Sequence, residues 1–146
     1  MPSRLSSSII PGYLFTGISG VLFTLVPPTS ISAFYINHNM YFVEVFGLFF
    51  ALGGFTALFS TIARKLFNVS VVPTWHFEMA GLFLQVSASA IYAYSLCVRG
   101  LETGDTNILA LGLFFVGISF MFTARISETY VNTRDYTLAQ REKDVD

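Results

Sequence analysis

The sequence contains few charged residues. Asp, Glu, Lys and Arg make up only 12% of the 146 residues, whereas hydrophobic residues make up 53%. A soluble domain usually carries about 25% charged residues. So little charge cannot cover the surface of a soluble globule of this length, and the mean hydropathy of +0.63 points the same way. The composition therefore indicates an integral membrane protein with a single domain.

Side chains that commonly carry chemistry are equally scarce. The one cysteine, Cys97, excludes an internal disulfide and a cysteine-based zinc site. The sequence has no HExxH pattern and no glycine-rich phosphate loop. The net charge is −1 and no basic stripe is present, which argues against nucleic-acid binding. We therefore expect no catalytic residue, no cofactor, no metal site and no nucleic-acid partner, and we expect that the chain is not an enzyme.

Long apolar runs are what the sequence has in abundance. Four of them cover residues 9–26, 41–63, 77–98 and 107–124. A helix needs about 20 apolar residues to cross the hydrocarbon core of a bilayer, and a chain in lipid must satisfy its backbone hydrogen bonds internally. The sequence thus predicts an all-α, four-span membrane bundle over residues 1–126 and a charged tail over residues 127–146. The segment 29–40 is compatible with either a short interfacial helix or a plain loop.

Lysine and arginine are unevenly distributed between the two sides of such a bundle. Of the eight, only Arg99 falls on the side opposite the termini. The other seven share the side of both termini: Arg4, Arg64, Lys65, Arg125, Arg134, Arg141 and Lys143. Because basic residues accumulate in cytoplasmic loops, the pattern predicts that both ends of the chain lie in the cytoplasm.

Small residues recur along one face of three of the runs. Their side chains allow helix backbones to approach closely in lipid. The positions are Gly12, Thr16 and Gly20 in the first run, Gly47, Ala51 and Gly54 in the second, and Ala110 and Gly117 in the fourth. Two interpretations remain open, namely packing within the bundle or a face through which copies of the chain associate.

The third run carries the most polar residues. Glu78, Gln85 and Tyr92 are seven residues apart and share a helix face, with Ser89 between them. Polar groups are costly against lipid, so this face should point inward or toward water. It could be a path for protons or solutes, or an interhelical seam of hydrogen bonds.

Two carboxylates lie at different depths of the predicted bundle. Glu44 is near the outer end of the second run and Glu78 is near the inner end of the third, so they cannot act on one reacting centre as an acid and a base. We expect each to meet a cation at its own depth. Glu44 would then pair with Arg99, and Glu78 with Arg64 or Arg125.

The order of features resembles the small four-span membrane proteins encoded beside lysis genes in phages of actinobacteria, often called holins. The resemblance covers the whole chain in outline. It rests on the short start that leads directly into a span, the break at Pro27–Pro28, the Arg64–Lys65 end of the second run, the segment Trp75-His76-Phe77-Glu78-Met79-Ala80-Gly81, and the charged tail.

The resemblance implies a protein that accumulates in the host cytoplasmic membrane and assembles laterally. The assembly would open lesions that dissipate the membrane potential and release a cell-wall hydrolase. Its partners would then be the lipid bilayer and further copies of itself. Two alternatives are an accessory subunit of a larger membrane complex and a small transporter that uses the polar line of the third run.

Overall fold

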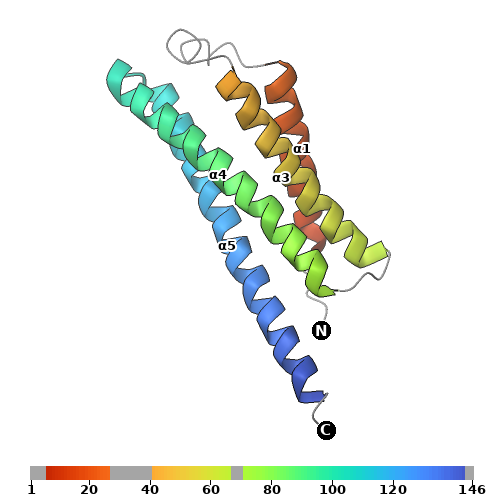
Figure 1. Ribbon diagram of the computed structural model, residues 1–146. Helices are drawn as coiled ribbons and strands as arrows, with labels where there is room; N and C mark the ends of the chain where they lie inside the picture. Colours follow the sequence, from red (N-terminus) through yellow and green to blue (C-terminus); the bar gives the residue numbers. More distant parts are fainter. Residues whose placement is uncertain (1–5, 27–40, 67–70, 144–146) are drawn as a thin grey trace.

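The computed structural model describes residues 6–26, 41–66 and 71–143, and nearly all of them are helical (Figure 1). The helices are α1 (Ser6–Leu25), α3 (Tyr41–Leu66), α4 (Val71–Thr103) and α5 (Thr106–Lys143). This confirms the predicted all-α class. The segment 29–40, for which the sequence allowed a helix or a loop, lies outside the described residues, as does Arg4.

Three of the helices are long and apolar enough to cross a membrane. The membrane-length segments are Glu44–Arg64 in α3, Val72–Thr103 in α4 and Thr106–Lys143 in α5. The apolar part of α1, from Ile9 to Leu25, is shorter. The structure therefore agrees with a helical membrane protein.

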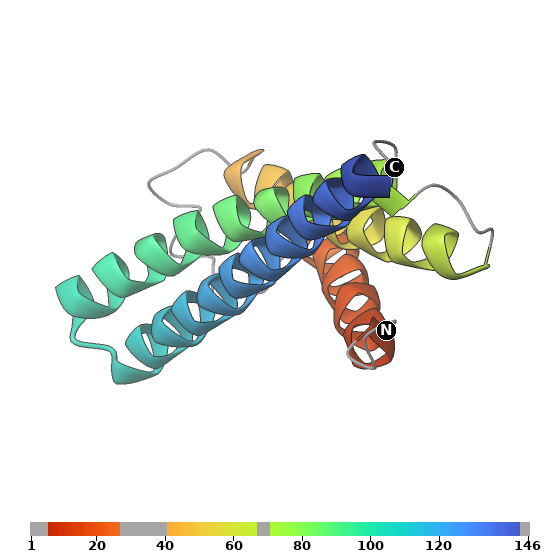
Figure 2. The ribbon, with the colours of Figure 1, turned by 90° about the horizontal axis from the view of Figure 1, so that it is seen from below.

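Consecutive helices run in opposite directions, so the start of α1 and the end of α5 lie at the same end of the molecule (Figure 1). Close backbone packing occurs between α1 and α3, between α3 and α4, and between α4 and α5. The molecule thus consists of two helix pairs, α1–α3 and α4–α5, which meet along α3 and α4, as the view along the molecule also shows (Figure 2). Only side chains connect α1 with α4 and α5.

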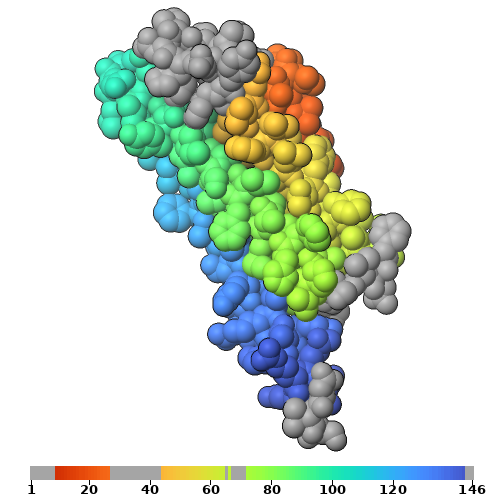
Figure 3. Space-filling view, viewed as in Figure 1, coloured from red at the N-terminus to blue at the C-terminus, as the bar shows by residue number. Residues whose placement is uncertain are grey.

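Two helices, α4 and α5, extend beyond their predicted runs by five residues or more at one end or both. The predicted tail begins at residue 127, yet α5 continues as one helix to Lys143 and projects past the other helices (Figures 1 and 3). The physical reason is that no Gly or Pro occurs between Gly117 and Lys143 to end it. Likewise, α4 begins at Val71 with Pro73 in its first turn, where a missing N–H removes no helical hydrogen bond.

The small residues of α1 and α3 pack against each other. A Cβ atom added to Gly20 would collide with the backbone of Ala51, and one added to Gly54 would lie 2.5 Å from the nitrogen of Gly17. Gly47 approaches Gly20 in the same interface, and Thr16 is buried nearby. These five predicted positions therefore serve packing within the chain.

The three remaining small residues of the predicted stripes face outward. A Cβ atom added to Gly12 or to Gly117 would meet nothing within 4 Å, and Ala110 is exposed. The residue of α5 that packs closely is instead Gly112, whose added Cβ would lie 2.7 Å from Cys97 Sγ. The predicted α5 stripe is thus not part of the internal packing, because α4 covers the helix face that holds Gly112.

An aromatic cluster fills the core on the side of the α4–α5 turn. Tyr92 lies between Phe46 and Phe115, with ring centroids 4.5 Å and 4.8 Å away, and Phe50 stacks on Phe46 at 5.6 Å. Many other large apolar side chains point outward, and Phe15 and Phe120 are more than 70% exposed. Such a surface suits contact with lipid tails rather than with water.

Candidate functional site

The carboxylate of Glu78 is the point at which the four described helices meet. Its side chain is fully buried in α4. The hydroxyl of Tyr13 in α1 donates to Oε1 at 2.9 Å, Arg64 Nη2 in α3 donates to Oε2 at 3.0 Å, and Arg125 Nη2 in α5 donates to Oε1 at 2.8 Å. We call Glu78, Tyr13, Arg64 and Arg125 the Glu78 cluster.

A second carboxylate completes the charge balance of the cluster. Glu128 accepts a hydrogen bond of 2.7 Å from Arg125 Nη1 and is 40% exposed. The two arginine side chains are 16% and 14% exposed, so two cations face two carboxylates in a largely enclosed space. Charge-assisted hydrogen bonds of this kind are roughly twice as strong as neutral ones, and they compensate part of the desolvation cost of the buried ions.

The helix ends explain why these side chains come together. Arg64 lies near the end of α3, Glu78 lies two turns into α4, and Arg125 lies midway along α5. Since the helices alternate in direction, these positions share one level of the molecule. The sequence suggested Arg64 or Arg125 as the partner of Glu78, and the structure has both.

Further polar contacts continue from Glu78 along α4. Gln85 Nε2 donates to Thr16 Oγ1 in α1 at 2.6 Å, and Ser119 Oγ in α5 donates to Ser89 Oγ at 2.9 Å. Gln85 and Ser89 are fully buried. The polar line of α4 is therefore enclosed by neighbouring helices and consists of interhelical hydrogen bonds.

One atom of this line lacks a partner within the described part of the chain. Gln85 Oε1 is buried and accepts no hydrogen bond there. Tyr92, the last member of the predicted line, has its ring in the aromatic cluster between Phe46 and Phe115. The ring of Tyr92 is thus part of the aromatic cluster, whereas Glu78, Gln85 and Ser89 form the hydrogen bonds described above.

The predicted pair of Glu44 and Arg99 does not form. No salt bridge joins the two, both of which the structure describes, and Glu44 is exposed. The reason is the register of α3 and α4. Phe46 stacks on Tyr92, and Arg99 lies seven residues, or about 10 Å, beyond Tyr92 along α4, whereas Glu44 is only about 3 Å from Phe46 along α3.

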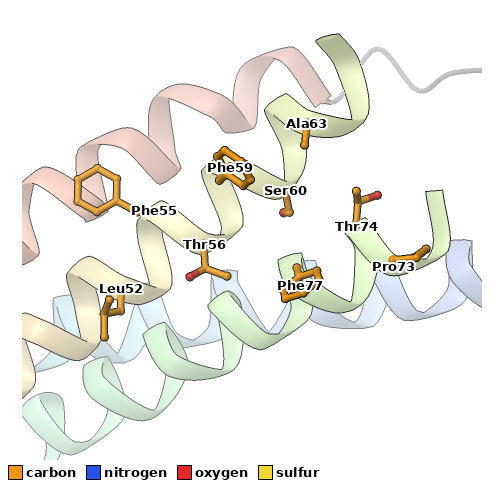
Figure 4. A pocket seen from close by; sticks show the side chains of 9 residues that line it. All are labelled: Leu52, Phe55, Thr56, Phe59, Ser60, Ala63, Pro73, Thr74 and Phe77. Carbon is orange, nitrogen blue, oxygen red and sulfur yellow. The ribbon is translucent and has the colours of Figure 1, made fainter. Parts of the chain in front are cut away.

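An apolar groove of about 640 Å³ runs between α3 and α4 near their connected ends. Leu52, Thr56 and Phe59 of α3 face Thr74 and Phe77 of α4 across it (Figure 4). Its lining contains no charged side chain among the described residues. Such a groove can hold an apolar chain, but it offers no group for acid–base or nucleophilic chemistry.

Three members of this network were not among the candidate residues from sequence. Tyr13 is the one buried tyrosine of α1, and a tyrosine hydroxyl inside an apolar run is itself a signal, because a buried O–H usually finds a partner. Glu128 lies three residues after Arg125, the spacing of neighbours on a helix surface. Ser119 had no signal beyond its place in an apolar run.

The Glu78 cluster and the hydrogen bonds along α4 can connect the helices and exclude water. Within the described residues they provide neither a cluster of three metal-binding side chains nor an open polar route. Comparisons of this chain with protein-family models, with curated proteins and with solved structures find no match.

Proposed function

We propose that this chain is a holin-like protein that crosses the cytoplasmic membrane of a bacterial host four times, with both ends inside, and permeabilises it through lateral assembly. In this proposal α1 is the fourth span. Its apolar part from Ile9 to Leu25 extends about 26 Å as a helix, which is close to the hydrocarbon thickness of about 30 Å.

The observation that carries the proposal is the division between a sealed polar interior and an apolar exterior. Glu78, Gln85 and Ser89 are fully buried within one copy, so a single copy offers no polar route of its own. Permeation would then require several copies that rearrange together. This favours lateral assembly over a transporter path along α4.

The outward small residues of α5 support the same proposal. Ala110 and Gly117 are exposed, and Gly117 has open space around it. In lipid, such positions allow a helix of another molecule to approach closely. The neighbour would be a second copy in a holin and a different protein in an accessory subunit.

Orientation is tested with single cysteines in a Cys97→Ser background. Glu44→Cys, which lies on an exposed face, should react with a membrane-impermeant maleimide added to intact cells. Arg141→Cys should react only after the inner membrane is opened. Reaction of Arg141→Cys in intact cells, or of both sites from one side, would contradict the proposed topology.

Permeabilisation is tested by inducible expression in bacteria loaded with a potential-sensitive dye. The chain should cause abrupt depolarisation after a lag, and co-expressed cell-wall hydrolase should then lyse the cells. Gly117→Leu should delay or abolish the depolarisation. Ala90→Leu introduces the same side chain at an exposed position of a different helix, α4. It should leave the lag before depolarisation unchanged.

Two outcomes would refute the holin proposal in favour of the alternatives. Harmless accumulation with stoichiometric copurification of another membrane protein would indicate an accessory subunit. Solute-specific flux without depolarisation, lost in Gln85→Leu, would indicate a transporter.

A further inference from the structure

A second groove, of about 750 Å³, lies between α4 and the C-terminal half of α5. On the α4 side, His76, Met79 and Phe83 line it, and their spacing of three and four residues places them on one helix face. On the α5 side, the lining includes Tyr130 and Arg134. We call this space the α4–α5 groove. It is distinct from the Glu78 cluster and from the groove between α3 and α4.

The charge in the α4–α5 groove has one sign. Arg134 and Arg141 are two helical turns apart, and both line the groove together with His76. No aspartate or glutamate occurs among its described lining residues. Asp135 approaches Arg134 at 3.5 Å, but both side chains are more than 60% exposed, and such exposed pairs contribute little. Arg134 is therefore available to another anion.

The polar and apolar parts of the groove lie at different depths. The rings of Trp75 and Tyr136 contact each other with centroids 5.8 Å apart, and tryptophan and tyrosine concentrate at the headgroup level of membranes. Arg134 is two residues from Tyr136, so it lies near this level. Phe83 is eight residues from Trp75 along α4, which places it about 12 Å deeper. The apolar end of the groove thus lies at the depth of acyl chains.

We propose that the α4–α5 groove binds an anionic phospholipid. One acyl chain lies along Met79 and Phe83, and the phosphate lies at Arg134 and Arg141. The lipid belongs to the leaflet next to the end of α5. The assignment rests on the proposed membrane insertion, and it is independent of permeabilisation.

His76 has a secondary role at this site. Its Nδ1 lies 2.7 Å from the carbonyl oxygen of Val72, so Nδ1 carries the hydrogen and donates it, because a carbonyl can only accept. The other ring nitrogen can donate to a phosphate only when the imidazole is protonated. Since arginine is always charged, Arg134 and Arg141 supply the main attraction.

The same charges argue against a second copy as the occupant. Val131 and Leu138 also line the groove and are seven residues apart, as in a helix that pairs with a copy of itself. A two-fold pairing through this face, however, would bring the arginines of both copies to one side of the contact. Like charges brought together in a contact are unfavourable, whereas a lipid phosphate complements them.

The test uses the purified full chain in micelles that contain equimolar phosphatidylglycerol and phosphatidylcholine, and native mass spectrometry counts the retained lipids. The wild type should retain one phosphatidylglycerol in preference to phosphatidylcholine. Arg134→Gln/Arg141→Gln should lower this preference about thirtyfold, the change expected for the loss of two attractions of about 1 kcal/mol each. Lys143→Gln removes one positive charge from α5 outside the groove lining and should change the preference less than twofold.

A steric variant tests the apolar end independently. Met79→Trp fills the groove without a change in charge and should displace the retained lipid, while helical circular dichroism stays at the wild-type value. The proposal is overturned if Lys143→Gln lowers the preference as much as the double variant does. It is also overturned if glycerol phosphate competes as well as the whole lipid, or if a dimer replaces the bound lipid.

These outcomes are separable from those of the proposed function. A preference for phosphatidylglycerol in a chain that never depolarises cells would retain the lipid site and refute the holin proposal. Depolarisation by a chain that shows no preference for phosphatidylglycerol would support the holin proposal and refute the lipid site.

Discussion

Replacement of Glu78 by glutamine removes the charge on which the Glu78 cluster depends while it keeps the shape of the side chain. The carboxylate accepts hydrogen bonds from Tyr13, Arg64 and Arg125 and is fully buried. In Glu78→Gln one oxygen can still accept from Arg125, but an amide N–H group would face Arg64, which also only donates. Two arginines would then remain in a largely enclosed space with one carboxylate, that of Glu128.

The magnitude follows from the buried ion pairs that the substitution breaks. Removal of one partner from a buried ion pair typically costs 3–5 kcal/mol. Glu128, at 2.7 Å from Arg125, keeps part of the charge compensation, so the lower end of that range applies. We expect Glu78→Gln to lower the free energy of unfolding by about 3 kcal/mol, which lowers Tm by roughly 10 °C for a chain of this length.

The assay is thermal unfolding of the purified protein in a mild detergent. The single tryptophan, Trp75, is a suitable probe, because Arg64 Cζ lies 5.6 Å from the centre of its ring and should shift when Glu78 no longer holds Arg64. Glu44→Gln is the matched control, since it is the same chemical change at an exposed position of α3. Its Tm should stay within about 2 °C of the wild type.

A double variant separates charge imbalance from local unfolding. Glu78→Gln/Arg125→Gln removes one anion and one cation, so it should be less destabilised than the sum of its two single variants. If Glu78→Gln unfolds within about 2 °C of Glu44→Gln, the buried charges of the Glu78 cluster contribute no measurable stability.

Three further changes test the packing and the polar line in the same assay. Gly20→Val should destabilise the protein by more than about 2 kcal/mol, because the added atoms collide with the backbone of α3. Gly12→Val, which places the same side chain in open space, should change stability by no more than about 0.5 kcal/mol. Equal Tm values for the two variants would contradict the α1–α3 interface. Tyr13→Phe should cost about 1.5–3 kcal/mol through the lost hydrogen bond to a charged acceptor, and an unchanged Tm would show that this hydroxyl is not engaged. Gln85→Leu loses the hydrogen bond of 2.6 Å from Gln85 Nε2 to Thr16 Oγ1 but also removes Oε1, an acceptor without a described partner. Since leucine is similar in volume, we expect a loss of no more than about 1.5 kcal/mol, the value of one neutral hydrogen bond; a loss above about 3 kcal/mol would mean that Oε1 also accepts a hydrogen bond in the folded protein.

The sequence predicted the presence of each described helix correctly, but it did not predict where α4 begins and ends or where α5 ends. Hydrophobic runs report where lipid can surround a helix, and they end where charges begin, at Ala124 in the last run. The helix itself ends where the backbone can no longer continue, and nothing between Gly117 and Lys143 interrupts α5. Hydropathy and helix boundaries therefore report different physical limits.

The partners of Glu78 were predictable because only cations at the same depth of the helix bundle can reach its carboxylate. A buried carboxylate near one end of a span must meet a cation at that end, and Arg64 and Arg125 were available there. The same reasoning was wrong for Glu44 and Arg99, since it assumes that the outer ends of α3 and α4 are level. Their register depends on side-chain packing, such as that of Phe46 on Tyr92, which hydropathy does not report.

Small-residue spacing located some helix contacts and missed others. In α1 and α3 the glycines face each other, but in α5 the packed glycine is Gly112, whereas Gly117 faces outward. Both lie in the same apolar run, and only the position of α4 distinguishes them. The sequence indicates which residues allow close approach, but not which neighbour makes it.

The separation of the Glu78 ligands along the chain sets an order for assembly during synthesis. Tyr13 precedes Glu78 by 65 residues and Arg64 precedes it by 14, while Arg125 follows it by 47. The carboxylate is therefore synthesised after two of its donors, and its second arginine follows only with the last described helix. A nascent chain halted before α5 would hold α1, α3 and α4, with Arg64 as the one cation in contact with Glu78 among the described residues. The arrival of α5 would then be the step that closes the structure.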